Sequence, residues 1–105
     1  MNLYELQQLV KKFCEDKNVN SSADVRIIDL FSEVGELSKE VLKGTDYGDK
    51  NFEKTEQWND EVGDVLFSLI CIANETDTDL EDCLMHVFEK YKERFSKKGD
   101  LGSGR

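Results

Sequence analysis

Apolar residues along this chain recur at intervals of three and four, the spacing that places them on one side of an α-helix. The pattern predicts four helices, at about residues 2–17, 22–43, 54–75 and 79–97. The chain has no proline, and β-branched residues seldom alternate with polar ones, so no strand is predicted. We therefore expect an all-α protein in which four amphipathic helices form a bundle-like fold.

The length of the chain fits one domain. Of the 105 residues, we assign 1–98 to a single helical domain and 99–105 to a flexible, glycine-rich tail. A chain this short buries a modest core. Because each predicted helix carries a wide apolar stripe, we expect the stripes to pack across subunits in a homodimer or a homotetramer.

Charge and composition exclude several classes of partner. The net charge of −9 argues against binding nucleic acid, which requires a basic face, but permits a nucleotide substrate if a bound cation reverses the local charge. No apolar run approaches the roughly 18 residues of a membrane-spanning helix, and the first residues do not resemble a signal peptide. Cys14, Cys71 and Cys83 are too widely spaced for a metal site and indicate reduced thiols. We expect a cytoplasmic protein with no nucleic-acid or membrane partner.

One short acidic motif occurs twice, as Glu-Val-Gly-Glu from Glu33 to Glu36 and as Glu-Val-Gly-Asp from Glu61 to Asp64. Residues three apart on a helix lie about 5–6 Å apart on one face, so each acid pair shares a face. Both pairs border apolar stripes and are expected beside a helix–helix contact. Four converging carboxylates repel one another and require a cation. Oxygen ligands favour Mg²⁺ or Mn²⁺ over zinc in a chain with a single histidine.

The glycine inside each motif supports a functional interpretation. Gly35 and Gly63 each cost about 1 kcal/mol relative to alanine in a helix interior. The missing side chain would compensate for this cost by allowing a second backbone or a ligand to approach closely. The alternative is that the acid pairs are solvated helix faces, since 35% of the chain is charged. Spacing alone leaves both interpretations open.

Three segments extend the pattern in a fixed order: LFSEVGELSKE, WNDEVGDVLFSLICIANETDTDLEDCL and EKYKERF. Together they resemble the MazG-type nucleoside triphosphate pyrophosphohydrolases, a family of the all-α group that also includes the dimeric dUTPases. The resemblance spans about residues 25–95 and implies a MazG-like helical domain that forms homo-oligomers. It also implies four metal ligands: Glu33, Glu36, Glu61 and Asp64.

The activity implied by the resemblance is Mg²⁺-dependent cleavage of a (deoxy)nucleoside triphosphate between the α and β phosphates, which gives a monophosphate and pyrophosphate. Mn²⁺ is a possible substitute. A metal-bound water has a lowered pKa and would attack the phosphate chain in line. One carboxylate would take the proton of that water, and Glu36 and Glu61 are the candidates. Glu40 and Asp60 extend the acidic stripes and are candidates to support the ligands.

Four further residues are candidates to bind the substrate. Lys90 and Arg94 match basic family positions near the phosphates, although a solvated face paired with neighbouring glutamates is the alternative. Asn74 resembles a family position close to the substrate, but asparagine near a helix end is also ordinary capping. Trp58 can stack on a base, whereas a single tryptophan on an apolar stripe is more typical of a core or an interface.

A second hypothesis is a non-enzymatic helical module that serves for oligomerisation or nucleotide sensing. The presence of all four acidic ligand types favours the enzyme. No stretch of the sequence specifies a contact to the base or to the sugar.

Overall fold

The computed structural model describes residues 1–98, and the tail predicted to be flexible, 99–105, lies outside the described residues. The described part contains four helices and no strand. The prediction of an all-α fold is confirmed. The helices are α1 (Leu3–Lys17), α2 (Ala23–Gly44), α3 (Trp58–Glu75) and α4 (Leu80–Lys98).

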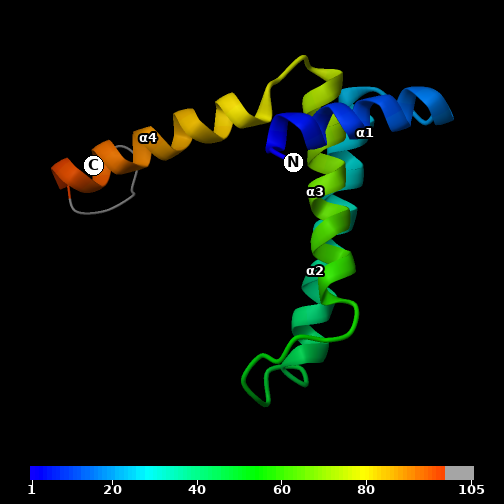
Figure 1. Ribbon diagram of the computed structural model, residues 1–105. Helices are drawn as coiled ribbons and strands as arrows, with labels where there is room; N and C mark the ends of the chain where they lie inside the picture. Colours follow the sequence, from blue (N-terminus) through cyan, green and yellow to red (C-terminus); the bar gives the residue numbers. More distant parts are fainter. Residues whose placement is uncertain (99–105) are drawn as a thin grey trace.

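Helices α2 and α3 form the main packed unit. They run antiparallel and side by side, and α1 crosses the end of the pair where α2 begins and α3 ends (Figure 1). Helix α4 leads away from that end, and its main contact is with α1. The radius of gyration is 16.9 Å, whereas a compact chain of this length has about 13 Å. A single chain is therefore less compact than a globular domain of the same length.

The core of the single chain is small. Its buried apolar residues are Cys14 of α1 and Ile70, Cys71 and Ala73 of α3. Cys14 and Cys71 meet where α1 contacts α3, with 3.9 Å between their sulfur atoms. Among the helices of the described part, none is long and apolar enough to cross a membrane.

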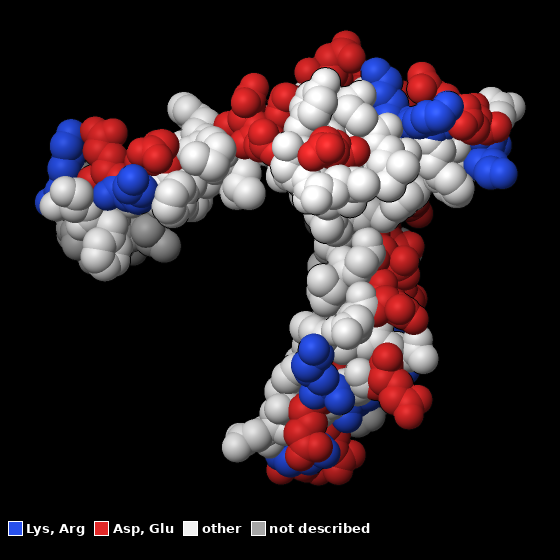
Figure 2. Space-filling model, viewed as in Figure 1, with Lys and Arg blue, Asp and Glu red and all other residues white. Residues whose placement is uncertain are grey.

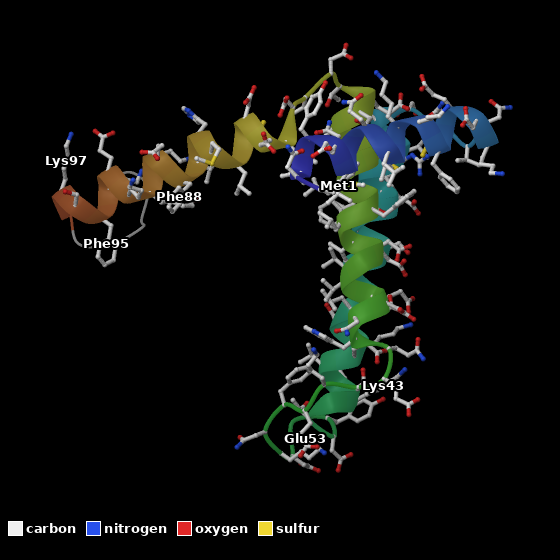
Figure 3. All side chains as sticks on the ribbon, in the orientation of Figure 1. Met1, Lys43, Glu53, Phe88, Phe95 and Lys97 are labelled. Carbon is white, nitrogen blue, oxygen red and sulfur yellow. The ribbon has the colours of Figure 1, made fainter. Side chains whose placement is uncertain are left out.

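Large apolar side chains are open to solvent on the other helices. Ile28 and Phe31 of α2 are 71% and 72% exposed, and Phe88 and Phe95 of α4 are 52% and 58% exposed. Phe88 and Phe95 project from one side of α4, toward the concave side of the molecule (Figure 3). Extended apolar surfaces of this kind mark sites of association.

A buried glutamine holds α1 in place. Gln7 donates through Nε2 to the carbonyl of Thr78 at 2.7 Å and to Oδ1 of Asn74 at 3.0 Å. Its Oε1 accepts from the backbone N–H of Leu80 at 3.0 Å. Burial of this polar side chain is tolerated because both ends of the amide are hydrogen-bonded. The contacts tie α1 to the turn between α3 and α4.

Helix α3 begins at Trp58, four residues later than the sequence predicts. The preceding segment, 45–57, folds back onto the end of α2 instead of continuing the helix. The backbone N–H of Glu53 donates to the carbonyl of Gly44 at 3.0 Å. A Cβ atom on Gly44 would lie 2.5 Å from the carbonyl oxygen of Glu53, so this close approach requires glycine.

Candidate active site

Three acids from two helices converge beside the contact between α2 and α3. One carboxylate oxygen each of Glu33, Glu61 and Asp64 lies within 4.8 Å of the other two. Glu33 and Glu61 are half-buried, and Asp64 is exposed. The antiparallel packing brings the two motifs to the same level, and acidic side chains line one edge of the pair (Figure 2). The expected convergence of the two motifs is therefore present for three of their four acids.

The three acids lack a compensating cation among the described side chains, residues 1–97. None of the ion pairs among residues 1–97 involves them. Loss of water on burial raises the pKa of Glu33, and repulsion from Asp64 raises it further. The same two causes, in the same order, raise the pKa of Glu61. A cation among these oxygen donors would remove the repulsion and favour the charged carboxylates.

The fourth predicted ligand, Glu36, stands apart from the group. Its carboxylate pairs with Nζ of Lys39 at 3.6 Å, and its side chain is 51% exposed. Its charge still contributes to the raised pKa of Glu33 and of Glu61. Glu36 is therefore near enough to act on the cluster electrostatically, and its role as a ligand stays a prediction.

Two of the predicted substrate-binding residues lie on α4, away from the acids. Nζ of Lys90 lies 5.3 Å from the centre of the Tyr91 ring, and the guanidinium carbon of Arg94 lies 5.9 Å from it. Because α4 leads away from the α2–α3 pair (Figure 1), one chain does not bring these cations to its own acidic cluster.

The other two predicted substrate-binding residues make packing contacts. Asn74 exchanges hydrogen bonds with Gln7 across the contact between α1 and α3. It lies ten residues beyond Asp64, about 15 Å along the helix. The Trp58 ring packs edge-to-face on Phe52, with 5.0 Å between the ring centroids. The Trp58 contact agrees with the packing alternative, whereas the Asn74 bonds join two helices and do not cap a helix end. Contact with a substrate stays a prediction for both residues.

The glycines of the two motifs are not needed for packing within the described part of one chain. A Cβ atom on Gly35 or on Gly63 would meet nothing within 4 Å. The idea that a second backbone of the same chain approaches them is therefore wrong for the described residues. Close approach of a ligand or of a second copy of the chain stays a prediction.

A further contact near the cluster involves Glu40, a residue of α2. Glu40 accepts a hydrogen bond from Oγ1 of Thr55 at 2.5 Å and pairs with Nζ of Lys43 at 3.3 Å. The Thr55 hydroxyl is the main cause of the lowered pKa of Glu40. The acidic stripe identified Glu40 from sequence, but Thr55 was missed, because it lies in a segment without periodicity and no local motif marks it.

Comparison with known proteins assigns the family. Residues 25–98 match the MazG nucleotide pyrophosphohydrolase domain. The chain is similar to the uncharacterized protein YpjD of Bacillus subtilis (strain 168), with 42% identity over 76 residues, which are 66% of this chain and 67% of YpjD.

Two crystal structures share the fold. One is that of the Bacillus-conserved MazG protein, a nucleotide pyrophosphohydrolase, with a TM-score of 0.73 and 30% identity over 87% of this chain and 89% of that chain. The other is the putative pyrophosphatase YPJD from Bacillus subtilis, with a TM-score of 0.73 and 32% identity over 87% of this chain and 95% of that chain. The predicted MazG-like architecture and the prediction of an enzyme are thereby confirmed. The chain belongs to the MazG nucleotide pyrophosphohydrolase family.

Proposed function

We propose that this enzyme hydrolyses a (deoxy)nucleoside triphosphate to the monophosphate and pyrophosphate, and that it depends on Mg²⁺ held by the acidic cluster. The observation that carries the proposal is the convergence of Glu33, Glu61 and Asp64 without a cationic partner in the described chain. The chemical class of the proposed reaction follows from the membership of this chain in the MazG family.

The donor set fits a hard divalent cation. Mg²⁺ prefers carboxylate oxygens and usually retains several waters, so three carboxylates, two of them half-buried, suit it. Mn²⁺ accepts the same ligands. The ion would supply neutralisation of the phosphate charge and a water of lowered pKa.

The side chains of the site have distinct proposed roles. Glu33, Glu61 and Asp64 would hold the cation, and Glu36 would join them by leaving its exposed pair with Lys39. Exposed ion pairs of this kind stabilise a protein by only about 0–1 kcal/mol, so loss of the pair between Glu36 and Lys39 costs little free energy. Glu36 and Glu61 remain the candidates to accept the proton of the attacking water.

Two copies of the chain would complete the site. The open apolar faces of α2 and α4 give a second copy a surface to cover. We propose a homodimer, or a homotetramer built from dimers, in which α4 of one copy brings Lys90 and Arg94 to the acidic cluster of the other. These two positively charged side chains would bind the negatively charged triphosphate there.

Pyrophosphate release from a panel of nucleotides, with and without Mg²⁺, tests the activity. The panel contains canonical and damaged ribo- and deoxyribonucleoside triphosphates, so that it also identifies the base and the sugar. We expect Mg²⁺-dependent release from at least one of them, and loss of that release in the Glu61→Gln variant. No release from any nucleotide would favour a non-enzymatic oligomerisation or nucleotide-sensing module.

A further inference from the structure

We propose that Glu40 is a positioning residue, which fixes the start of α3 through its hydrogen bond with Thr55 and thereby holds Glu61 beside Glu33. The inference rests on the proposed function, because it concerns the same acidic cluster. It assigns a role to a pair of residues that lies outside both acidic motifs.

The burial of Glu40 is unusual for an acid. Its exposed fraction is 4%, and no other acid in the described part of the chain is buried to this degree. A buried carboxylate is tolerated when its oxygens are hydrogen-bonded. One oxygen accepts from Oγ1 of Thr55, and the other faces Nζ of Lys43.

The position of Glu40 on α2 relates it to the cluster. It follows Glu33 by seven residues, which is about two helical turns, so both side chains lie on the same side of α2. The hydrogen bond from the Thr55 hydroxyl to Glu40 therefore fixes the position of Thr55, in the segment 45–57, relative to Glu33 on α2.

The path from Thr55 to Glu61 is short and hydrogen-bonded. The carbonyl of Thr55 accepts from the backbone N–H of Trp58 at 3.3 Å, and the carbonyl of Gln57 accepts from the N–H of Glu61 at 3.0 Å. A tether at Thr55 therefore acts on the first turn of α3, which carries Glu61.

Helix α3 lacks the usual local signal for its start. Its N-cap residue, Gln57, makes no side-chain capping hydrogen bond, although a capping side chain normally helps to define the first turn. The contact of Glu53 with Gly44 holds the same segment, but it lies farther from Glu61 along the chain. The pair of Glu40 and Thr55 is the nearer tether.

The charge of Glu40 does not explain its presence here. Repulsion by Glu40 is among the causes that raise the pKa of Glu61, so its charge alone adds to the repulsion. Hydrogen bonding is the favourable contribution, and outer partners of metal ligands commonly act by holding the ligands in orientation.

Mn²⁺ binding to the full-length protein, followed by the electron paramagnetic resonance signal of the free ion, tests the inference. Thr55→Val retains the shape of the side chain and removes the hydroxyl, and Glu40→Ala removes the acceptor. We expect both variants to raise the Kd for Mn²⁺ about 10-fold or more. Glu40→Gln retains a carbonyl acceptor and should remain within about 3-fold of wild type.

Matched variants separate positioning from charge and from general stability. Glu53→Gln alters an exposed acid of the same segment, whose side chain is 77% exposed and pairs with Lys50, and it should leave the Kd unchanged. If Glu40→Ala fails to fold, Thr55→Val decides the question. Equal weakening by Glu40→Gln and Glu40→Ala, with a wild-type Kd for Thr55→Val, would overturn the inference.

The wild-type measurement separates the two proposals. If wild type does not bind Mn²⁺, the proposed metal site fails and the inference fails with it. If wild type binds Mn²⁺ and Thr55→Val binds it equally well, the inference alone is overturned.

Discussion

Burial and repulsion act in the same direction on Glu33 and Glu61, since both oppose the charged form of the carboxylate. In the absence of a cation, the charged forms of these two candidate ligands therefore oppose the fold that positions them. Asp64 is the main source of repulsion for both. If Asp64 had a structural role, neutralising it would lower the stability of the metal-free protein. If Asp64 binds a cation, neutralising it would maintain or raise that stability.

Asp64→Asn should leave the metal-free protein as stable as wild type or more stable, because it removes this repulsion. The same change should reduce the rise in melting temperature on adding Mg²⁺, since it weakens a ligand and so the stabilisation by binding. Asp16→Asn, on α1 and outside the acidic motifs, changes a side chain that is 58% exposed; it should change stability by no more than about 0.5 kcal/mol and retain the Mg²⁺ response. Melting curves with and without Mg²⁺ measure both effects. An equal Mg²⁺ shift in wild type and Asp64→Asn would contradict the metal site.

The raised pKa of Glu61 predicts a pH dependence with a definite sign. A carboxyl group whose pKa is raised by folding binds its proton more tightly in the folded state, so its favourable contribution is complete below the unfolded value of 4.5. That contribution is lost as the pH rises through the folded pKa. The unfolding free energy of metal-free wild type, relative to Glu61→Gln, should therefore fall as the pH rises above 4.5. Urea titrations from pH 4 to pH 8 would measure the difference, and a flat difference would argue against a raised pKa.

At the scale of the helices, the glycines of the two motifs stand out because they weaken α2 and α3 without serving the packing of the chain. Gly35→Ala should raise the stability of the metal-free protein by about 1 kcal/mol, because alanine is the better helix former and its Cβ has free space. If a ligand or a second copy uses that space, the same variant loses activity or association. Gly44→Ala is the contrasting variant, because its Cβ would lie 2.5 Å from a carbonyl oxygen, and it should destabilise the protein. A stable, fully active and normally associated Gly35→Ala variant would show that the glycine is dispensable.

The limits of prediction from sequence follow from which contacts are local. The four helices were predictable because the apolar period of each lies in consecutive residues. The start of α3 was not, since Gln57 provides no cap and the segment before Trp58 is held by contacts with α2. Likewise, the spacing of the motifs placed Glu33 and Glu36 on one face of α2. Only the antiparallel packing decides that Glu33 joins the acids of α3, while Glu36 pairs with Lys39.

The whole molecule combines an acidic edge on the α2–α3 pair with an apolar concave side that no part of the described chain covers (Figures 2 and 3). The basic residues proposed to contact phosphate lie on α4, away from the acids of the same chain. An oligomer would account for both features, because it would bury the apolar faces and bring the cations of one copy to the acids of another. Light scattering at micromolar concentration should give the mass of a dimer or a tetramer, and a monomeric mass would contradict this arrangement.

Mixing two inactive variants tests whether α4 acts across the interface. Glu61→Gln removes an acid of the cluster, and Lys90→Ala removes a cation of α4. In a symmetric dimer with shared sites, a mixed dimer contains one site in which both residues are intact and one in which both are changed. Mixed dimers should therefore have about half of the wild-type activity. If each site takes both residues from one chain, every site retains one defect and no activity returns. The assay requires the two variants to be co-expressed with different tags and purified through both, which proves that mixed oligomers are present. Absence of activity in that doubly purified protein would place Lys90 outside a shared site.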